Sequence, residues 1–115
     1  MRFYKQQRLR RQSDFHKVRE RGRTFRCPHF FLQFQPKVTC GNEERRRIGI
    51  ITSRRVGNAV KRNRGRRLFR EIFRRNQDSL PKCCDLVVVV RSCYNVAGFD
   101  ELQELYLKAV NYTSK

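Results

Sequence analysis

Residues 53–76 read SRRVGNAVKRNRGRRLFREIFRRN and hold ten Arg or Lys residues against a single acid, Glu71. Plotted as a helix, at 100° per residue, they separate into an apolar face and a cationic face. The apolar face requires a core to cover it. The cationic face repels itself unless a polyanion lies alongside, because Glu71 alone could form the i,i+4 pairs of a solvated charged helix. The stretch therefore predicts a helix that packs on a core and presents arginine to nucleic acid. The apolar face comprises Gly65, Leu68, Phe69, Ile72 and Phe73, and the cationic face comprises Asn63, Arg66, Arg67, Arg70 and Arg74, with Arg64 and Arg75 at its border.

The composition of the whole chain supports this interpretation. The 115 residues carry a formal net charge of +18 at pH 7, and the hydrophobic fraction is only 38%. We expect one domain with an economical core and an acidic polymer as partner. No apolar run approaches a transmembrane length, and the basic N-terminus lacks the apolar segment of a secretory signal. Five cysteines without CxxC spacing indicate free thiols in a reducing cytoplasm.

The N-terminal half is predicted to contain an arm, a short helix and two strands. Residues 1–12 form a basic arm that is mobile when alone. The short helix that follows is capped by Ser13 and ended by Gly22. Residues 30–35, FFLQFQ, alternate as a strand whose second face is polar, since it carries two glutamines. Residues 47–52 form a strand whose isoleucines require burial on both faces.

The C-terminal half supplies the basic helix, a central strand and a last helix. Asn58 caps the basic helix, which is expected to run to about residue 79, before a proline. Residues 85–91 contain four consecutive valines, which is typical of a buried central strand. Gly98 precedes a helix with apolar residues at helical spacing. The prediction is a single α+β domain spanning residues 1–115, an α-β-β-α-β-α sandwich with a mixed sheet.

Other functions fit the residues less well. His16 and His29 share no motif, and the acids lack metal-ligand spacing, so the chain is not expected to cleave RNA alone. Cys27 and His29 could be half of a zinc site, but no second half follows. A membrane is disfavoured because the core needs the apolar face of the basic helix. DNA is disfavoured because no helix-turn-helix, heptad or zinc-finger pattern is present.

The run Lys61-Arg62-Asn63-Arg64-Gly65-Arg66-Arg67-Leu68-Phe69-Arg70-Glu71, with residues 53–60 before it, resembles the signature helix of the bacterial ribonuclease P protein subunit. The resemblance implies a subunit of an RNA-based endonuclease that removes the 5′ leader of precursor tRNA. It implies two partners, the catalytic RNA and precursor tRNA, and places the catalytic groups and the Mg²⁺ of the holoenzyme with the RNA. It also implies a left-handed β-α-β crossover, whereas most proteins have a right-handed one. The alternative is a ribosomal or other structured-RNA-binding protein with no role in cleavage, which shares the same chemistry.

Two surfaces follow from the resemblance. One binds the catalytic RNA, and the other is a cleft that receives the leader. Arg19 stands where relatives often place a second cleft aromatic, and Gly65 stands where they usually carry an aliphatic residue. Phe15 and Phe31 could each be ordinary core instead of stacking on a base. The RNA-binding residues are Arg54, Arg55, Lys61, Arg62, Asn63, Arg64, Arg66, Arg67, Arg70 and Arg74, and the cleft residues are Phe15, Arg19, Phe31 and Gln33.

Overall fold

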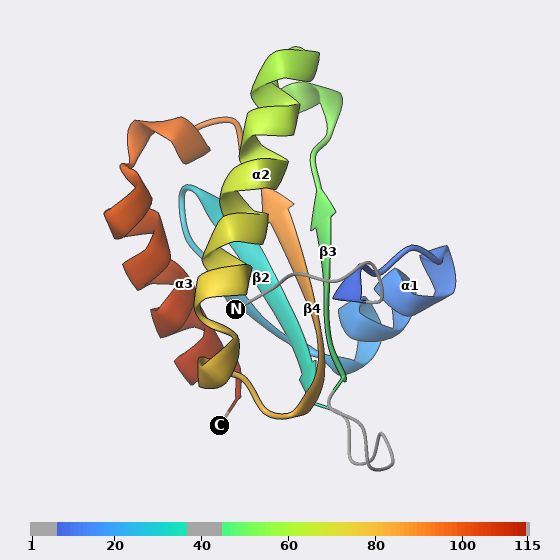
Figure 1. Cartoon of the computed structure of the whole chain (residues 1–115). Coiled ribbons are helices and arrows are strands. Elements are labelled where there is room, and N and C mark those ends of the chain that lie inside the picture. Colours follow the sequence, from blue (N-terminus) through green and yellow to red (C-terminus); the bar gives the residue numbers. More distant parts are fainter. Residues whose placement is uncertain (1–6, 37–44, 115) are drawn as a thin grey trace.

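A computed structural model of the chain describes residues 7–36 and 45–114. Within them, three α-helices pack on a four-stranded sheet (Figure 1). The helices and strands, in chain order, are α1 (Gln12–Arg21), β1 (Arg23–Arg26), β2 (Phe30–Pro36), β3 (Arg45–Ile51), α2 (Ala59–Arg75), β4 (Cys83–Val90) and α3 (Phe99–Thr113). Three single 3₁₀ turns join them: η2 (Arg54–Val56), η3 (Gln77–Ser79) and η4 (Tyr94–Val96). The predicted α+β class and mixed sheet are confirmed.

The sheet has the order β1-β2-β4-β3, in which β2 is antiparallel to both neighbours and β3 is parallel to β4. In Figure 1, β3 and β4 both point upward, α2 crosses in front of them, and β4 lies to the left of β3. A right-handed crossover would place β4 on the right. The connection is therefore left-handed, as the resemblance implied.

The sequence prediction missed β1 and misplaced two helix ends. Two of the four residues in β1 are arginines, so no apolar alternation marks it; it forms because it pairs with β2. Helix α1 has Arg11 at its N-cap, so Ser13 lies inside the helix and is not its cap. Helix α2 ends at Arg75, and the separate turn η3 follows where the helix was expected to continue. Among the described residues, no helix is long and apolar enough to cross a membrane.

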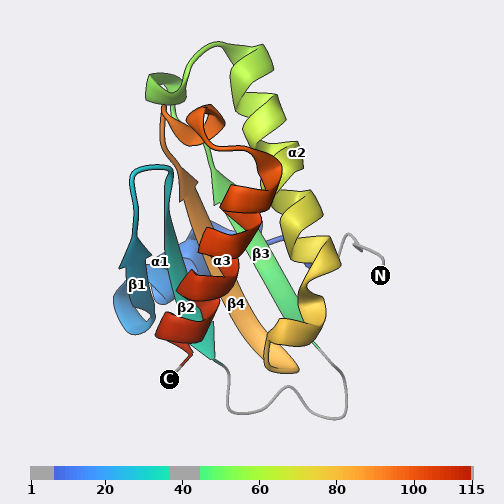
Figure 2. The ribbon, with the colours of Figure 1, turned by 90° about the vertical axis from the view of Figure 1, so that its left-hand side faces the viewer.

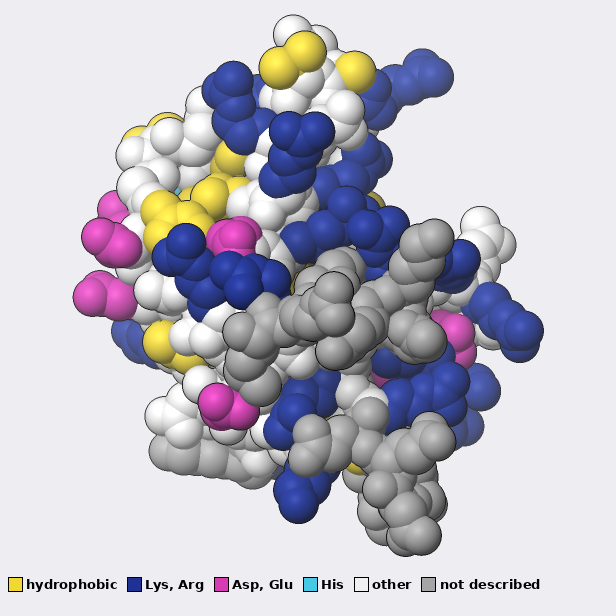
Figure 3. Space-filling view, viewed as in Figure 1, with side chains coloured by type: hydrophobic (Ala, Val, Ile, Leu, Met, Phe, Trp, Pro, Cys, Tyr) yellow, Lys and Arg dark blue, Asp and Glu magenta, His cyan; other side chains and the backbone are white. Residues whose placement is uncertain are grey.

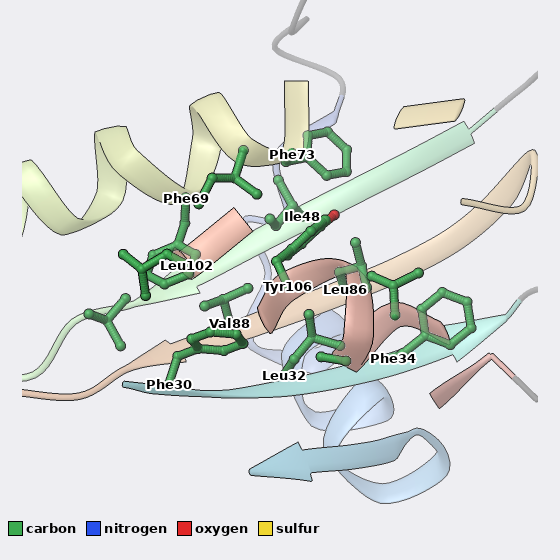
Figure 4. Packing of buried hydrophobic residues seen from close by; sticks show 14 of the residues in the cluster. Phe30, Leu32, Phe34, Ile48, Phe69, Phe73, Leu86, Val88, Leu102 and Tyr106 are labelled. Atoms are coloured by element: carbon green, nitrogen blue, oxygen red, sulfur yellow. The ribbon is translucent and has the colours of Figure 1, made fainter. Parts of the chain in front are cut away.

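One face of the sheet carries the main core. Every second residue of β2 and β4 points toward α2 and α3, which together cover this face (Figures 2 and 4). Phe30, packed edge-on at 5.2 Å from the ring of Phe69, joins β2 to α2. The predicted apolar faces of the basic helix and of the β2 strand are therefore confirmed. The fully buried side chains here include Phe30, Leu32, Phe34, Phe69, Ile72, Phe73, Leu86, Val88, Leu102 and Tyr106.

The opposite face is covered in part by α1. Val18 of α1 is fully buried there with Val87 of β4 and Leu9 of the N-terminal segment. Helix α1 ends where predicted, at Gly22. A side chain would clash at this position, because a Cβ would lie 2.5 Å from the carbonyl oxygen of Val18 and 2.6 Å from that of Phe34. Helix α1 does not cover the rest of this face, which is open to solvent.

Residues 7–11, which belong to the predicted arm, are docked along the outer edge of β3. The N–H of Leu9 donates to the carbonyl oxygen of Ile48 at 3.0 Å, and Arg8 bridges to the same residue. The side-chain amide of Gln7 donates to Gln77 Oε1 at 2.8 Å. The sequence did not predict this docking, because Leu9 is a single apolar residue among arginines. In the structure Leu9 is only 6% exposed.

Candidate nucleic-acid interface

Helix α2 carries the cationic surface and is fixed at both ends. At its start, Asn58 Oδ1 accepts the N–H of Lys61 at 2.9 Å, which is the predicted cap. Lys61 Nζ donates to the carbonyl oxygen of Ser92 at 2.7 Å and lies 5.9 Å from the ring centre of Tyr94. The Tyr94 hydroxyl in turn donates to the carbonyl oxygen of Lys61 at 2.7 Å. These bonds hold the N-terminal turn of α2 against η4.

The arginines of α2 are not equally available. Arg64 and Arg67 are exposed, although Arg64 was expected only at the border of the cationic face. Arg66 and Arg70 are half-buried. Arg66 Nη1 donates to Asn63 Oδ1 at 2.8 Å, and burial lowers the pKa of Arg70. Figure 3 shows Lys and Arg side chains gathered over α2 and toward the β3 side, with most of the acidic side chains of this view on the α3 side. On this face of the molecule the positive charge is therefore concentrated away from α3.

The last predicted contact of this surface, Arg74, is engaged within the protein. Its Nε donates to Glu71 Oε1 at 2.6 Å, and this hydrogen bond is the main reason that the pKa of Glu71 lies below its usual value. Arg75, which is exposed, also lies over the ring of Phe99, at 5.0 Å from its centre. The single acid of the basic helix thus holds its C-terminal turn, and the cations free to meet RNA lie nearer its middle.

Arg62 has an unusual local environment. Its Nε is buried and has no hydrogen-bond partner among the described residues. Buried donors are normally satisfied, since an unmade bond costs about 1–3 kcal/mol. An incoming oxygen acceptor would satisfy it. Arg54 and Arg55, which were predicted to extend the same surface, are exposed in η2 just before α2.

All four predicted cleft residues line one hollow on the other face of the sheet. It has a volume of about 980 Å³ and lies between α1 and the open part of the sheet. Phe15 and Arg19 come from α1, and Phe31 and Gln33 come from β2. Sequence reasoning missed its other walls, of which Ile51 is the clearest case. It was predicted to be buried, but it is 39% exposed because α1 does not reach it.

Strand pairing explains why the cleft opens at one end. Across β3, β4 and β2, this face has three rows: Arg47-Asp85-Gln35, then Gly49-Val87-Gln33, then Ile51-Val89-Phe31. Helix α1 lies over the first two rows. A Cβ at Gly49 would meet the ring of Phe15 at 2.3 Å, so the missing side chain is what admits that ring. Phe15 is therefore both a wall of the cleft and part of the packing that holds α1.

The first row is an ion pair that sequence reasoning did not find. Arg47 donates through Nε and Nη2 to the two carboxylate oxygens of Asp85, at 2.8 Å each, and Asp85 is 2% exposed. Arg47 Nη1 also lies 3.6 Å from Asp14 Oδ2 of α1. The hydrogen bonds to Asp85 raise the pKa of Arg47 against the opposing effect of burial. The cluster ties α1 to β3 and β4, and its partners are 38 and 33 residues apart along the chain.

Phe31 is half-buried in the cleft wall and already has cationic neighbours. The guanidinium carbons of Arg26 and Arg91 lie 5.5 Å and 5.0 Å from its ring centre. A stacking base would have to share or displace these contacts. Neither arginine was predicted as a site residue. They come from β1, which the sequence did not reveal, and from the residue after β4.

The described residues offer little to a metal ion. No three His, Cys, Asp or Glu residues group together among them in a way that could hold a metal. Cys27 and Cys93 hydrogen-bond to backbone carbonyl groups, and the four described cysteines are thiols outside any disulfide, while Cys40 lies outside the described residues. His29 Nδ1 lies 3.0 Å from the carbonyl oxygen of Cys93, away from His16 on α1.

The fold and the two surfaces define a small α+β protein of the nucleic-acid-binding class. The family model for ribonuclease P matches residues 3–113. The chain belongs to the ribonuclease P protein family, which confirms the resemblance and decides against the ribosomal alternative. It is 38% identical over 96 residues to the ribonuclease P protein component of Desulfovibrio desulfuricans, covering 84% of this chain and 72% of that protein. It is 42% identical over 97 residues to that of Chloroflexus aggregans, covering 84% and 69%.

Solved structures show the same fold. The ribonuclease P protein of Thermotoga maritima superposes with a TM-score of 0.73 at 31% identity, covering 88% of this chain and 92% of that one. That of Staphylococcus aureus gives 0.77 at 22% identity, covering 92% and 94%. The sheet order, the helix positions and the left-handed crossover thus belong to a fold that structures in this family share.

Proposed function

We propose that this component of ribonuclease P is the non-catalytic subunit that holds the catalytic RNA on one surface and the 5′ leader of precursor tRNA on another. The observation that carries the proposal is the convergence of Phe15, Arg19, Phe31 and Gln33 on one hollow, on the sheet face opposite α2. Two partners can therefore be bound at once without competing for the same side chains.

Each surface has chemistry suited to its proposed partner. The guanidinium groups of α2 match phosphate oxygens in geometry and charge, without reading base sequence. The cleft instead combines aromatic rings, an amide and flanking arginines, which suits single-stranded nucleotides that stack while their backbone meets cations. The chain is expected to work in the cytoplasm, where precursor tRNA is processed.

Catalysis is proposed to belong to the RNA. His16 lies at the cleft, 3.8 Å from Glu20, but both side chains are largely exposed and no nucleophile is held between them. The donor set for Mg²⁺ would be the phosphates of the RNA, since the described protein side chains form no cluster for it. The contribution of the protein is to screen phosphate repulsion and to position the leader.

Cleavage of precursor tRNA with long and short leaders tests this division. With its RNA subunit at low Mg²⁺, the protein should speed cleavage, and without RNA it should cleave nothing. Phe15→Leu keeps most of the packing volume but removes the ring, so affinity for a leader of several nucleotides should fall by about 1 kcal/mol. Arg19→Gln should also weaken it. Lys108→Gln, which removes an exposed charge of α3 away from the cleft, is the matched control.

The leader length separates function from folding. Every deficit should disappear when the leader is trimmed to one or two nucleotides, because nothing then reaches the cleft. If Phe15→Leu shows the same loss with trimmed and full leaders, the ring acts only in packing and the cleft is not a leader site. Cleavage by the protein without RNA would overturn the non-catalytic role.

A further inference from the structure

The turn that joins β1 to β2 lies against the residues that follow β4. The N–H of Arg91 donates to the carbonyl oxygen of His29 at 3.1 Å, which continues the antiparallel β2–β4 pairing beyond the end of the strands. His29 Nδ1 also lies 3.0 Å from the carbonyl oxygen of Cys93. Residues 27–30 and 91–93 are therefore held together, although they are far apart in the sequence.

Each of these two segments contributes a half-buried cysteine. Cys93 Sγ donates to the carbonyl oxygen of Pro28 at 2.6 Å, and Cys27 Sγ donates to that of Phe30 at 3.3 Å. The backbone N–H of Cys27 donates to the same oxygen of Phe30 at 3.0 Å, which closes the turn. Because Pro28 follows Cys27 directly in the chain, both thiols contact one tight turn.

The other two described cysteines are placed differently. Cys83 and Cys84 are neighbours at the start of β4, whereas Cys93 lies beyond its end, and they are only 7% and 0% exposed. Thiol–disulfide exchange needs access for the reagent and two sulfurs that can come within bonding reach of each other. Among the described residues, Cys27 and Cys93 are the thiols that are partly open to solvent and share one site.

The two cysteines are also next to the cations that flank Phe31 in the cleft. Arg26, whose guanidinium carbon lies 5.5 Å from the centre of the Phe31 ring, immediately precedes Cys27. The guanidinium carbon of Arg91 lies 5.0 Å from the same ring centre, and Arg91 Nη1 donates to the carbonyl oxygen of Cys27 at 3.4 Å. A covalent link from Cys27 to Cys93 therefore restrains both arginines around this ring.

We propose that Cys27 and Cys93 form an oxidation site, at which a low-molecular-weight disulfide converts the two thiols into an intramolecular disulfide that weakens leader binding. The thiolate of one cysteine attacks the reagent RSSR and releases one RSH, and the second cysteine then attacks the mixed disulfide and releases the other. The protein is oxidised by two electrons, and the reagent is reduced to two thiols. Leader binding weakens because a base that stacks on Phe31 must displace an arginine that the link restrains. This last step rests on the proposed function, whereas formation of the disulfide does not.

Glutathione buffers of defined oxidised-to-reduced ratio test the disulfide in the full chain, without RNA. Peptide mapping by mass spectrometry should find Cys27 linked to Cys93, and dithiothreitol should reverse the link. Cys40→Ser, the matched control, should still form it. In Cys27→Ser, Cys93 should carry only a mixed disulfide with glutathione. A wild-type protein that forms only mixed disulfides, or that links other cysteines instead, would overturn the proposal.

Leader affinity is then compared between the oxidised and the reduced protein, each assembled with the ribonuclease P RNA. Oxidation should lower the affinity for precursor tRNA with a leader of several nucleotides by about two- to fivefold, the size of one exposed cation–π contact. It should not change the affinity when the leader is trimmed to one or two nucleotides. The difference should vanish in Cys27→Ser and in Cys93→Ser. Equal affinity of the oxidised and reduced wild type for the full leader would overturn the effect on leader binding.

The outcome is separable from the proposed function. A wild-type protein that speeds cleavage but never links Cys27 to Cys93 retains the function and loses the oxidation site. A protein that forms the link but assists cleavage in neither redox state retains the oxidation site, and loses both the proposed function and the effect on leader binding.

Discussion

The two faces of the sheet differ in how completely helices cover them and in the kind of side chain they carry. The face under α2 and α3 is sealed by large apolar side chains, and the charged side chains of both helices lie outside this core. The face under α1 changes along its length, from the buried Arg47–Asp85 pair, through Gly49, to the open row that contains Phe31. The comparison indicates that the sealed face gives α2 a rigid support, whereas the graded face leaves space for a ligand.

The largest expected effect concerns the ion pair under α1. Asp85→Asn leaves the half-buried Arg47 guanidinium without a charged partner on β4, and this should destabilise the protein by about 3 kcal/mol. Asp14→Asn, which removes only the longer contact at 3.6 Å, should cost about 1 kcal/mol or less. Urea unfolding measures both. A cost below about 1 kcal/mol for Asp85→Asn would show that the buried Arg47–Asp85 pair adds little to the stability of the protein.

The next prediction concerns the exposed cations of α2 and their part in binding the RNA subunit. Replacing Arg64 and Arg67 with Gln removes two exposed cations of α2. If each meets a phosphate, the salt dependence of binding to the RNA subunit should flatten by about one to two units, and affinity at 0.15 M salt should fall by roughly tenfold. The matched control replaces Lys17 of α1 and Lys108 of α3. An equal loss in that control would mean that the overall charge, and not the surface of α2, binds the RNA.

The smallest expected effects on stability come from replacing two glycines with alanine, and they should have opposite signs. Gly49→Ala pushes a methyl group into the ring of Phe15 and should destabilise the protein by about 1–2 kcal/mol. Gly65→Ala places its Cβ at 3.4 Å from Val90 and 3.5 Å from Tyr94, which are ordinary contacts. It should stabilise the protein by about 0.5–1 kcal/mol, because alanine is the better helix former. Thermal unfolding tests both, and a loss of stability in Gly65→Ala would show that α2 sits closer to η4 than this geometry allows.

The amino-acid sequence by itself determined the basic helix and most of the sealed face. Helical and strand periodicity report which residues of one element share a face, so the burial of Phe69 and of Phe30 could be predicted locally. The cap at Asn58 is equally local, since it involves residues three positions apart. The family resemblance of residues 53–71 also lies within one element and needs no tertiary information.

Tertiary structure alone decided the graded face and the docking of residues 7–11 at the β3 edge. Strand β1 forms through its antiparallel pairing with β2. Ile51 is exposed because α1 does not extend over it. The partners of Arg47 come from α1 and β4, and nothing in the spacing of Asp14 and Asp85 marks them as neighbours. Leu9 docks because its backbone N–H bonds to Ile48 of β3 while its side chain packs with Val18 of α1. Local pattern fixes which way a side chain points from its own element, but only the packing of distant elements fixes what it meets there.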